Sequence, residues 1–303
     1  MPFTICLINN YNYSKFLPDC LDSVINQTVK FDKIIIVDDG STDNSIDVIA
    51  QYQKSNFNFF SILKKNEGQL STFNAALPLI SDNSQVFLLD SDDIYPKDYL
   101  ELMKMAVGDN FPDFCYCMAN EFKNGQIAEN STAFRGNYPN ETFHKSSALV
   151  RSRHLWLGRQ TSCISLSSSL YKKIFPYPRT GDFITRADDV IIYAASIIGS
   201  TKLFLPSIQI GYRTHESNYF FGKTSSTVES ARYKAALDIL FEWYCKSYSL
   251  SRHPSINEFY RELKMLTKQQ RLRLEIPGNY RILRTLIGRK YIWPLLKFAR
   301  LRT

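Results

Sequence analysis

The chain has 303 residues, of which 44% are hydrophobic and 22% are charged, and its formal net charge is +8. These proportions are ordinary for a globular protein that can bury a full core. The longest apolar run, residues 190–198, is too short to span a bilayer, and the first residues show no signal-peptide pattern. We therefore expect a cytoplasmic protein.

The six cysteines lie at positions 6, 20, 115, 117, 163 and 245, and no two of them are spaced as C-x-x-C. This spacing argues against the common zinc and redox motifs. Most of the cysteines stand in apolar, strand-like surroundings, so we expect buried free thiols in a reducing compartment.

The first 120 residues alternate between apolar runs and amphipathic stretches, which predicts a mostly parallel sheet with helices on its faces. The predicted strands are 3–8, 33–37, 59–63, 85–89 and 113–118, and the predicted helices are 15–27, 44–54, 69–79 and 97–107. Beyond a loop or hairpin region we predict strands at 163–166, 202–205 and 208–212, and helices at 145–155, 167–174, 186–198, 228–248, 256–274 and 280–301.

Three carboxylates stand together where the fourth predicted strand ends, at Asp90, Asp92 and Asp93. Ligands bind outside the carboxyl ends of the strands in open α/β sheets. Acids this close repel one another unless a cation neutralises them, and hard oxygen ligands suit Mg²⁺ or Mn²⁺. We expect a divalent ion that holds a diphosphate. The alternative is a solvated acidic turn that caps the helix beginning near Pro96.

A second pair of acids, Asp38 and Asp39, ends the strand at 33–37 and precedes Gly40, which permits a tight turn. Adjacent acids at a strand end are costly without a partner, so we expect them to contact N–H or O–H groups of a ligand. Ser41 and Asp43 are better explained as caps of the following helix.

In this order the motifs resemble those of the family 2 glycosyltransferases, which are inverting nucleotide-sugar enzymes with the GT-A fold. The resemblance implies a catalytic domain at 1–220, with a nucleotide-sugar half at 1–120 and an acceptor half at 121–220, and a helical, basic extension at 221–303. Seven segments carry it: INNYN at 8–12, QT at 27–28, VDDGSTD at 37–43, NEG at 66–68 with NAA at 74–76, LDSDD at 89–93, ADD at 187–189 and YRTH at 212–215.

The resemblance also implies roles for single residues. Asp92 is expected to bind Mn²⁺ or Mg²⁺ directly, with Asp90 on the metal or the ribose and with Asp93 and His215 completing the metal site. Arg213 either pairs with phosphate or forms a salt bridge at the sheet edge. The remaining expected nucleotide contacts are Asn10, Tyr11, Asn12, Asp38, Asp39, Asn66 and Gly68.

The general base is expected at the start of the helix at 186–198, where Asp188 and Asp189 are adjacent. Relatives usually carry Glu-Asp here and use the second acid, which maps onto Asp189. The Asp-Asp variant leaves open which of the two acts. The alternative is that both acids only cap the helix.

The expected function is transfer of one sugar from a nucleoside diphosphate, most often UDP in this family, to a saccharide hydroxyl during synthesis of a bacterial surface polysaccharide. The tryptophans, at 156, 243 and 293, do not stand in the Gln-x-x-Arg-Trp motif of processive relatives. Two alternatives remain, a nucleotidyltransferase that makes sugar nucleotides and a scaffold without activity. The chain lacks the Gly-rich signature near the N-terminus that would favour the first, and its intact acids argue against the second.

The charge excess lies in the last part of the chain, since residues 252–303 hold thirteen Lys or Arg and three Glu. In residues 280–303 the cations alternate with Trp and Leu, a pattern typical of peripheral contact with the inner face of a membrane. The alternative is that the apolar residues pack on the catalytic domain or on a second copy of the chain. Nucleic acid is a poor candidate partner, because no recognised module accompanies the charge.

Overall fold

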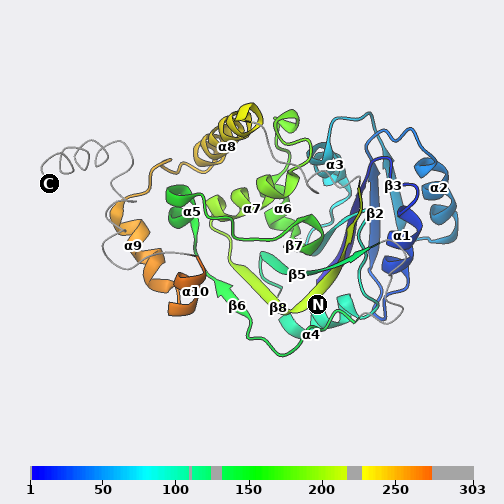
Figure 1. Cartoon of the computed structure of the whole chain (residues 1–303), viewed down its shortest axis with the longest axis horizontal. Coiled ribbons are helices and arrows are strands. Elements are labelled where there is room, and N and C mark those ends of the chain that lie inside the picture. Colours follow the sequence, from blue (N-terminus) through cyan, green and yellow to red (C-terminus); the bar gives the residue numbers. More distant parts are fainter. Residues whose placement is uncertain (1, 109–110, 124–131, 217–226, 275–303) are drawn as a thin grey trace, which may run out of the picture.

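The computed structural model describes residues 2–108, 111–123, 132–216 and 227–274. Within them, an eight-stranded mixed sheet runs in the order β3-β2-β1-β4-β7-β5-β8-β6 (Figure 1). The strands are β1 (Phe3–Asn10), β2 (Lys33–Asp38), β3 (Phe59–Leu63), β4 (Ser84–Asp90), β5 (Phe114–Lys123), β6 (Glu141–Phe143), β7 (Ile164–Ser167) and β8 (Lys202–Thr214). The helices are α1 (Leu17–Ile25), α2 (Ser45–Ser55), α3 (Gln69–Ala76), α4 (Tyr99–Val107), α5 (Ser147–Arg153), α6 (Ser168–Ile174), α7 (Ala187–Ile198), α8 (Thr227–Ser247), α9 (Ile256–Met265) and α10 (Lys268–Arg273).

The sheet is parallel through its first four strands in space, which confirms the α/β prediction. Strands β3, β2, β1 and β4 pair in parallel, so their carboxyl ends meet at one edge. Strand β7 then lies antiparallel between β4 and β5, while β5 and β8 are parallel to each other. The fifth predicted strand is therefore separated from the fourth by a segment that comes later in the chain.

The central strands are apolar on both sides and build two cores, because successive side chains point to opposite faces. Ile5 and Leu7 of β1 join the core that holds α3, α6 and α7, whereas Cys6 and Ile8 join the core that holds α1 and α4. All six cysteines are buried and free, as expected.

The chain differs from prediction at Pro206, which was expected to separate two strands. The structure has one strand there, β8, whose pairing with β5 shifts register opposite Cys117 and Met118. The shift loops residues 206–208 out of the ladder, so the missing N–H of Pro206 breaks no ladder bond.

The helix predicted over 256–274 is two helices, α9 and α10. The backbone at Leu266 is extended, with φ −76° and ψ 136°, which ends α9. Thr267 then starts the second helix, because its hydroxyl accepts from the Gln270 N–H at 3.1 Å while the Gln270 side chain accepts from the Thr267 N–H at 2.9 Å. This reciprocal cap favours a new helix over a continued one.

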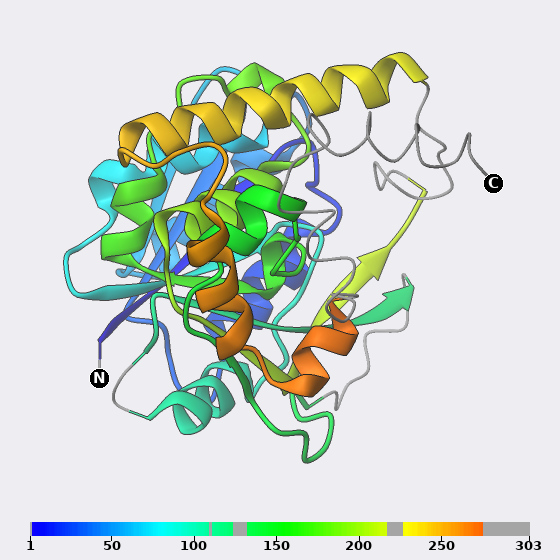
Figure 2. The ribbon, with the colours of Figure 1, turned by 90° about the vertical axis from the view of Figure 1, so that its left-hand side faces the viewer.

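Helices α8 and α9 pack on elements that precede them in the chain. Helix α8 lies along α7 as a long rod (Figure 2). Helix α9 packs on α5, where the buried Glu262 carboxylate accepts from the Leu149 N–H at 2.9 Å. Among the described residues, no helix is both long and apolar enough to cross a membrane. The helix expected at 280–301 and the membrane contact expected of 280–303 lie outside the described residues.

Candidate active site

A cavity of about 330 Å³ opens at the edge where the parallel strands end. Register places the tips of three strands together, because Asn10 of β1 pairs with Asp38 of β2 and Asn9 pairs with Asp90 of β4. Polar side chains at these tips therefore converge on one place. The lining includes Asn10, Tyr11, Tyr13, Asp39, Asn66, Gly68, Gln69, Asp90, Ser91, Asp92, Thr161, Ile184, Asp188 and Tyr212.

Asp90, Asp92 and Asp93 form the acidic cluster, whose nearest carboxylate oxygens lie within 4.8 Å of one another; Asp90 and Asp92 line the cavity, and Asp93 is buried beside them. Removal from water, reinforced by the charge of Asp92, raises the pKa of Asp90 to about 8. The same two causes raise the pKa of the buried Asp93. The buried Ser91 hydroxyl has no hydrogen-bond partner among the described residues. Crowded carboxylates of this kind fit a hard divalent cation, which would neutralise them.

His215 lies against Asp92 of the acidic cluster, and its expected role as a metal ligand stays a prediction. Its Nε2 atom is 3.0 Å from Oδ2 of Asp92, and its ring packs on Phe16 with 4.6 Å between ring centroids. An imidazole nitrogen beside the Asp92 carboxylate suits a mixed nitrogen and oxygen metal site.

Two donors hold Asp93 in place. The Ser162 hydroxyl donates to its Oδ2 at 2.5 Å, and the Arg213 N–H donates to its Oδ1 at 2.9 Å. The Ser162 oxygen also accepts from the Asp90 N–H at 3.0 Å. The acidic turn is thus tied to the segment before β7 and to the end of β8.

The Arg213 guanidinium is already engaged within the protein. It donates from Nε to the Asp92 carbonyl at 2.8 Å and pairs with Asp19 of α1 at 2.9 Å. Phe16 and Phe122 also contact it, at 5.0 and 4.7 Å from the ring centroids. These contacts favour the salt-bridge alternative, and the expected phosphate contact stays a prediction.

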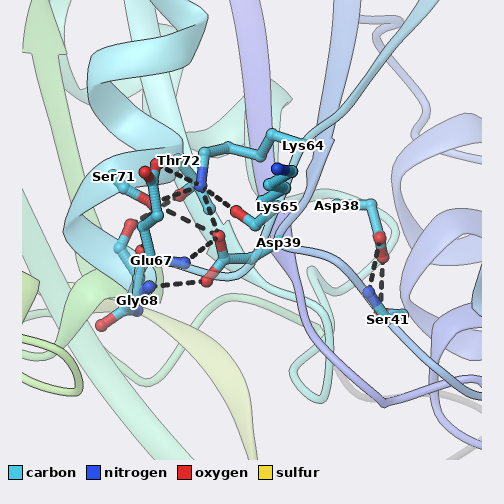
Figure 3. A network of polar contacts seen from close by, with 10 residues as sticks. Asp38, Asp39, Ser41, Lys64, Lys65, Glu67, Gly68, Ser71 and Thr72 are labelled. Carbon is cyan, nitrogen blue, oxygen red and sulfur yellow. Dashed lines mark hydrogen bonds and ion pairs between the residues drawn. The ribbon is translucent and has the colours of Figure 1, made fainter.

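Asp38 holds the turn that follows β2 (Figure 3). It accepts from the Asn10 side chain at 2.7 Å and from the Ser41 N–H and hydroxyl at 2.8 and 2.6 Å. Ser41 therefore does not cap α2. Asn44 is the N-cap residue of α2 and makes no side-chain cap bond, while Asp43 just before it accepts from the Ser45 N–H at 3.0 Å. The predicted ligand contact of Asp38 stays a prediction.

Asp39 lines the cavity and anchors the loop before α3 (Figure 3). Its carboxylate pairs with Lys64 at 2.7 Å and accepts from the Gly68 and Glu67 N–H groups at 2.8 and 3.1 Å. Gly68 has φ +90°, and a Cβ atom there would lie 2.9 Å from the Ile184 Cα. Only glycine fits this close approach without strain.

The expected contacts of the nucleoside gather around the same loop. Tyr11 is 45% exposed and lines the cavity together with Asn66. Asn12 instead joins two loops, because its side-chain oxygen accepts from the Thr42 N–H at 2.7 Å and its N–H donates to Ser41 at 2.8 Å. Tyr11 and Asn66 are thus placed to meet a ligand directly.

The two acids at the start of α7 have different surroundings. Asp188 lines the cavity, and burial together with the charge of Asp189 raises the pKa of its carboxyl to about 7. Asp189 is 1% exposed and accepts from the Trp156 indole at 2.8 Å and the Tyr233 hydroxyl at 2.7 Å. Arg186 pairs with it at 2.7 Å.

Several residues in or beside the cavity had no signal in the sequence. Gln69 donates to Asp90 at 2.8 Å, and its N–H donates to the Ile184 carbonyl at 2.9 Å, so it links the acidic cluster to the segment before α7. Its position directly after the NEG motif was the one available hint. Ser162, Trp156 and Tyr233 come from segments in which no motif was readable.

Sequence comparison identifies the family. Residues 6–174 match the sequence profile of glycosyl transferase family 2. An uncharacterized glycosyltransferase of Nostoc sp. is 28% identical over 77% of this chain and 71% of its own length. A chondroitin synthase of Escherichia coli is 33% identical over 34% of this chain, and the match spans only 15% of that longer protein.

Solved structures show the same fold. TarS residues 1–349 of S. aureus in complex with UDP-GlcNAc aligns over 98% of this chain and 87% of its own, with a TM-score of 0.61 at 16% identity. The mannosyltransferase PcManGT of Pyrobaculum calidifontis, in complex with GDP-Man and Mn²⁺, aligns over 91% of this chain and 84% of its own, with a TM-score of 0.50 at 14% identity. With the family profile covering more than half of the sequence, this chain belongs to glycosyl transferase family 2 and is a glycosyltransferase.

Proposed function

We propose that this enzyme moves a single sugar, with inversion, from a nucleoside diphosphate, in the first place UDP, to a hydroxyl of a growing saccharide. One observation carries the proposal: a single cavity joins the acidic cluster, the nucleoside-side residues Tyr11 and Asp39, and Asp188. Polysaccharide synthesis is the proposed setting, because relatives include proteins named as chondroitin and hyaluronan synthases.

The acidic cluster and His215 are the residues that would hold the divalent ion, with Asp92 as the central ligand. When bound, such an ion neutralises the negative charge that grows on a leaving diphosphate. The protein orients this site through Ser162, Gln69 and the Arg213 N–H, which fix the carboxylates of Asp93 and Asp90 before any ligand arrives. Rotamers locked in this way lower the cost of binding.

We assign removal of the acceptor proton to Asp189 and contact with the donor sugar to Asp188. Inversion requires the acceptor to attack from the side opposite the leaving diphosphate. Asp188 lies near Asp90, since their charges act on each other, and so it stands on the diphosphate side. Asp189 points instead toward Trp156 and Tyr233, and the donors around it fix the orientation that proton transfer needs.

Calorimetric titration of UDP, dTDP, GDP and CMP, each with Mn²⁺ and with EDTA, tests the proposal. One nucleoside diphosphate should bind in Mn²⁺ and lose most of its affinity in EDTA. Asp92→Ala should abolish the difference between the two conditions, whereas Asp47→Ala, which changes an exposed acid on α2, should not. Binding that is equal with and without metal would refute the metal-dependent mechanism.

The assignment of the two acids has its own test. Asp189→Asn should abolish transfer while leaving nucleotide affinity within about twofold, since it removes a group that acts only in the reaction. Asp188→Asn should instead weaken binding of the intact sugar nucleotide more than binding of the free nucleotide. The reverse pattern would make Asp188 the base.

A further inference from the structure

Asp189 is the centre of a cluster that the donor cavity does not use. The cluster consists of Asp189, Trp156, Tyr233 and Arg186. Besides its contacts with Trp156 and Tyr233, the buried carboxylate pairs with Arg186, whose guanidinium lies 4.0 Å from the centroid of the Tyr233 ring. The four residues come from three places in the chain, namely the segment after α5, the start of α7 and the first third of α8.

The exposed indole of Trp156 marks this cluster as a binding surface. The residue is 40% exposed although its N–H is fixed to a carboxylate that is 1% exposed. Single exposed aromatic residues are common on proteins and need no explanation. Here, however, a hydrogen bond to Asp189, the proposed base, holds the ring in place while much of the ring surface stays exposed to solvent.

The chemistry of the cluster fits a sugar ring. A flat aromatic face packs against the apolar C–H face of a pyranose, and a ring with few torsions does so at low entropic cost. The side chain of Arg186 is 40% exposed, and its guanidinium lies over the Tyr233 ring, so a charged group borders the aromatic surface. A hydroxyl at the edge of a ring stacked on Trp156 would come within reach of Asp189.

We propose that Trp156, Tyr233 and Arg186 form the acceptor subsite, which binds the terminal sugar ring of a saccharide and presents one hydroxyl to Asp189. The inference rests on the proposed function and names the residues that bind the second substrate of the enzyme, the acceptor saccharide. Trp156 stacks on the sugar, and Tyr233 is a positioning residue that holds the carboxylate. Helix α8, which the sequence placed in a C-terminal extension, thereby contributes to the catalytic site.

Trp156→Ala is the main test, and Trp243→Ala is its matched control. Trp243 is 43% exposed, lies on α8 and contacts Tyr177 rather than the cluster. Ten residues separate it from Tyr233, which is about 15 Å along a helix. The probes are 4-nitrophenyl β-glycosides of glucose, galactose and N-acetylglucosamine, supplied with the sugar nucleotide that calorimetry selects.

Trp156→Ala should raise the KM for the glycoside about tenfold, the size expected for loss of an aromatic stacking partner. Its affinity for the nucleoside diphosphate in Mn²⁺ should stay within about twofold, and Trp243→Ala should match the wild type in both. A wild-type KM in Trp156→Ala would overturn the subsite. If Trp156→Ala does not fold, Trp156→Phe, which keeps an aromatic ring and loses the N–H, should show a smaller rise in KM.

Tyr233→Phe separates a positioning role from a structural one. It removes only the hydroxyl that donates to Asp189, so kcat should fall about tenfold while the KM for the glycoside changes little. Equal changes in both constants, or none, would remove Tyr233 from the site. A wild-type enzyme that binds no nucleoside diphosphate would instead refute the proposed function, so the two failures are distinguishable.

Discussion

The environment of Asp188 predicts that removing its charge raises stability at high pH and weakens binding of the sugar nucleotide. Burial and the neighbouring Asp189 raise the pKa of Asp188 from 3.8 to about 7. Each factor of ten in a proton equilibrium is worth about 1.4 kcal/mol, so ionising this carboxyl in the folded protein costs at most about 4 kcal/mol. Because the raised pKa means that the folded state binds the proton more tightly than the unfolded state does, the protonated carboxyl contributes to stability below pH 4. This contribution is lost as the pH rises to about 7.

Asparagine at position 188 keeps the shape of the side chain and carries no charge. We therefore expect Asp188→Asn to be more stable than the wild type at pH 8 by up to about 4 kcal/mol, and to differ from it little near pH 4. For a domain of this size the gain at pH 8 corresponds to roughly 2–4 °C in Tm per kcal/mol. At the same time the variant should lose affinity for the sugar nucleotide, as is common where stability is gained at a functional site.

The assay is thermal unfolding in EDTA at pH 4.5, 6 and 8, with Asp47→Asn as the control because it changes an exposed acid on the first turn of α2. The Tm of the wild type should fall relative to Asp188→Asn as the pH rises, and Asp47→Asn should follow the wild type. If Asp188→Asn and the wild type show the same pH dependence, the proposed environment of Asp188 is wrong.

Three further predictions concern the loop before α3 and the residue that links it to the acidic cluster. Asp39→Asn should lower the free energy of unfolding by about 2 kcal/mol, because it removes the buried carboxylate that pairs with Lys64 and leaves that ammonium with the exposed Glu67 as its ion-pair partner; an unchanged urea midpoint would contradict this. Gly68→Ala should destabilise the loop and weaken nucleotide binding in calorimetry, since its Cβ would meet Ile184 and its φ is positive. Gln69→Leu should lower kcat while the Tm stays close to that of the wild type, because the lost contact is a hydrogen bond to Asp90 in a partly open cavity; a folding defect without a rate defect would assign it a structural role only.

Much of the fold and of the donor side of the site could be predicted from the sequence, because local patterns carried the information. Apolar runs that end in Asp38 and Asp90 marked strands whose tips meet, and the structure brings those tips together. The order of strands could not be read in the same way. Strand β7 lies between β4 and β5 through pairing over long sequence distances, which no local pattern encodes.

The acceptor side was not predictable for a similar reason. Trp156 stands in a stretch without periodicity, and Tyr233 lies on a helix whose own pattern indicates only packing against α7. Their meeting at Asp189 depends on how three distant segments fold together. Ser41 was misread for a local reason, because its hydroxyl donates to Asp38, three residues before it, instead of capping the helix that follows.

The hydrogen bonds that hold the acidic turn at residues 90–93 have a consequence for folding. Asp93 is held by Ser162, 69 residues away, and by the backbone of Arg213, 120 residues away. The turn therefore acquires its final geometry only after β7 and β8 have joined the sheet, which requires contacts between residues far apart in the sequence. A cation that binds the finished turn but not the unfolded chain would stabilise the completed domain selectively. The affinity of the protein for this cation would then report whether β7 and β8 have joined the sheet.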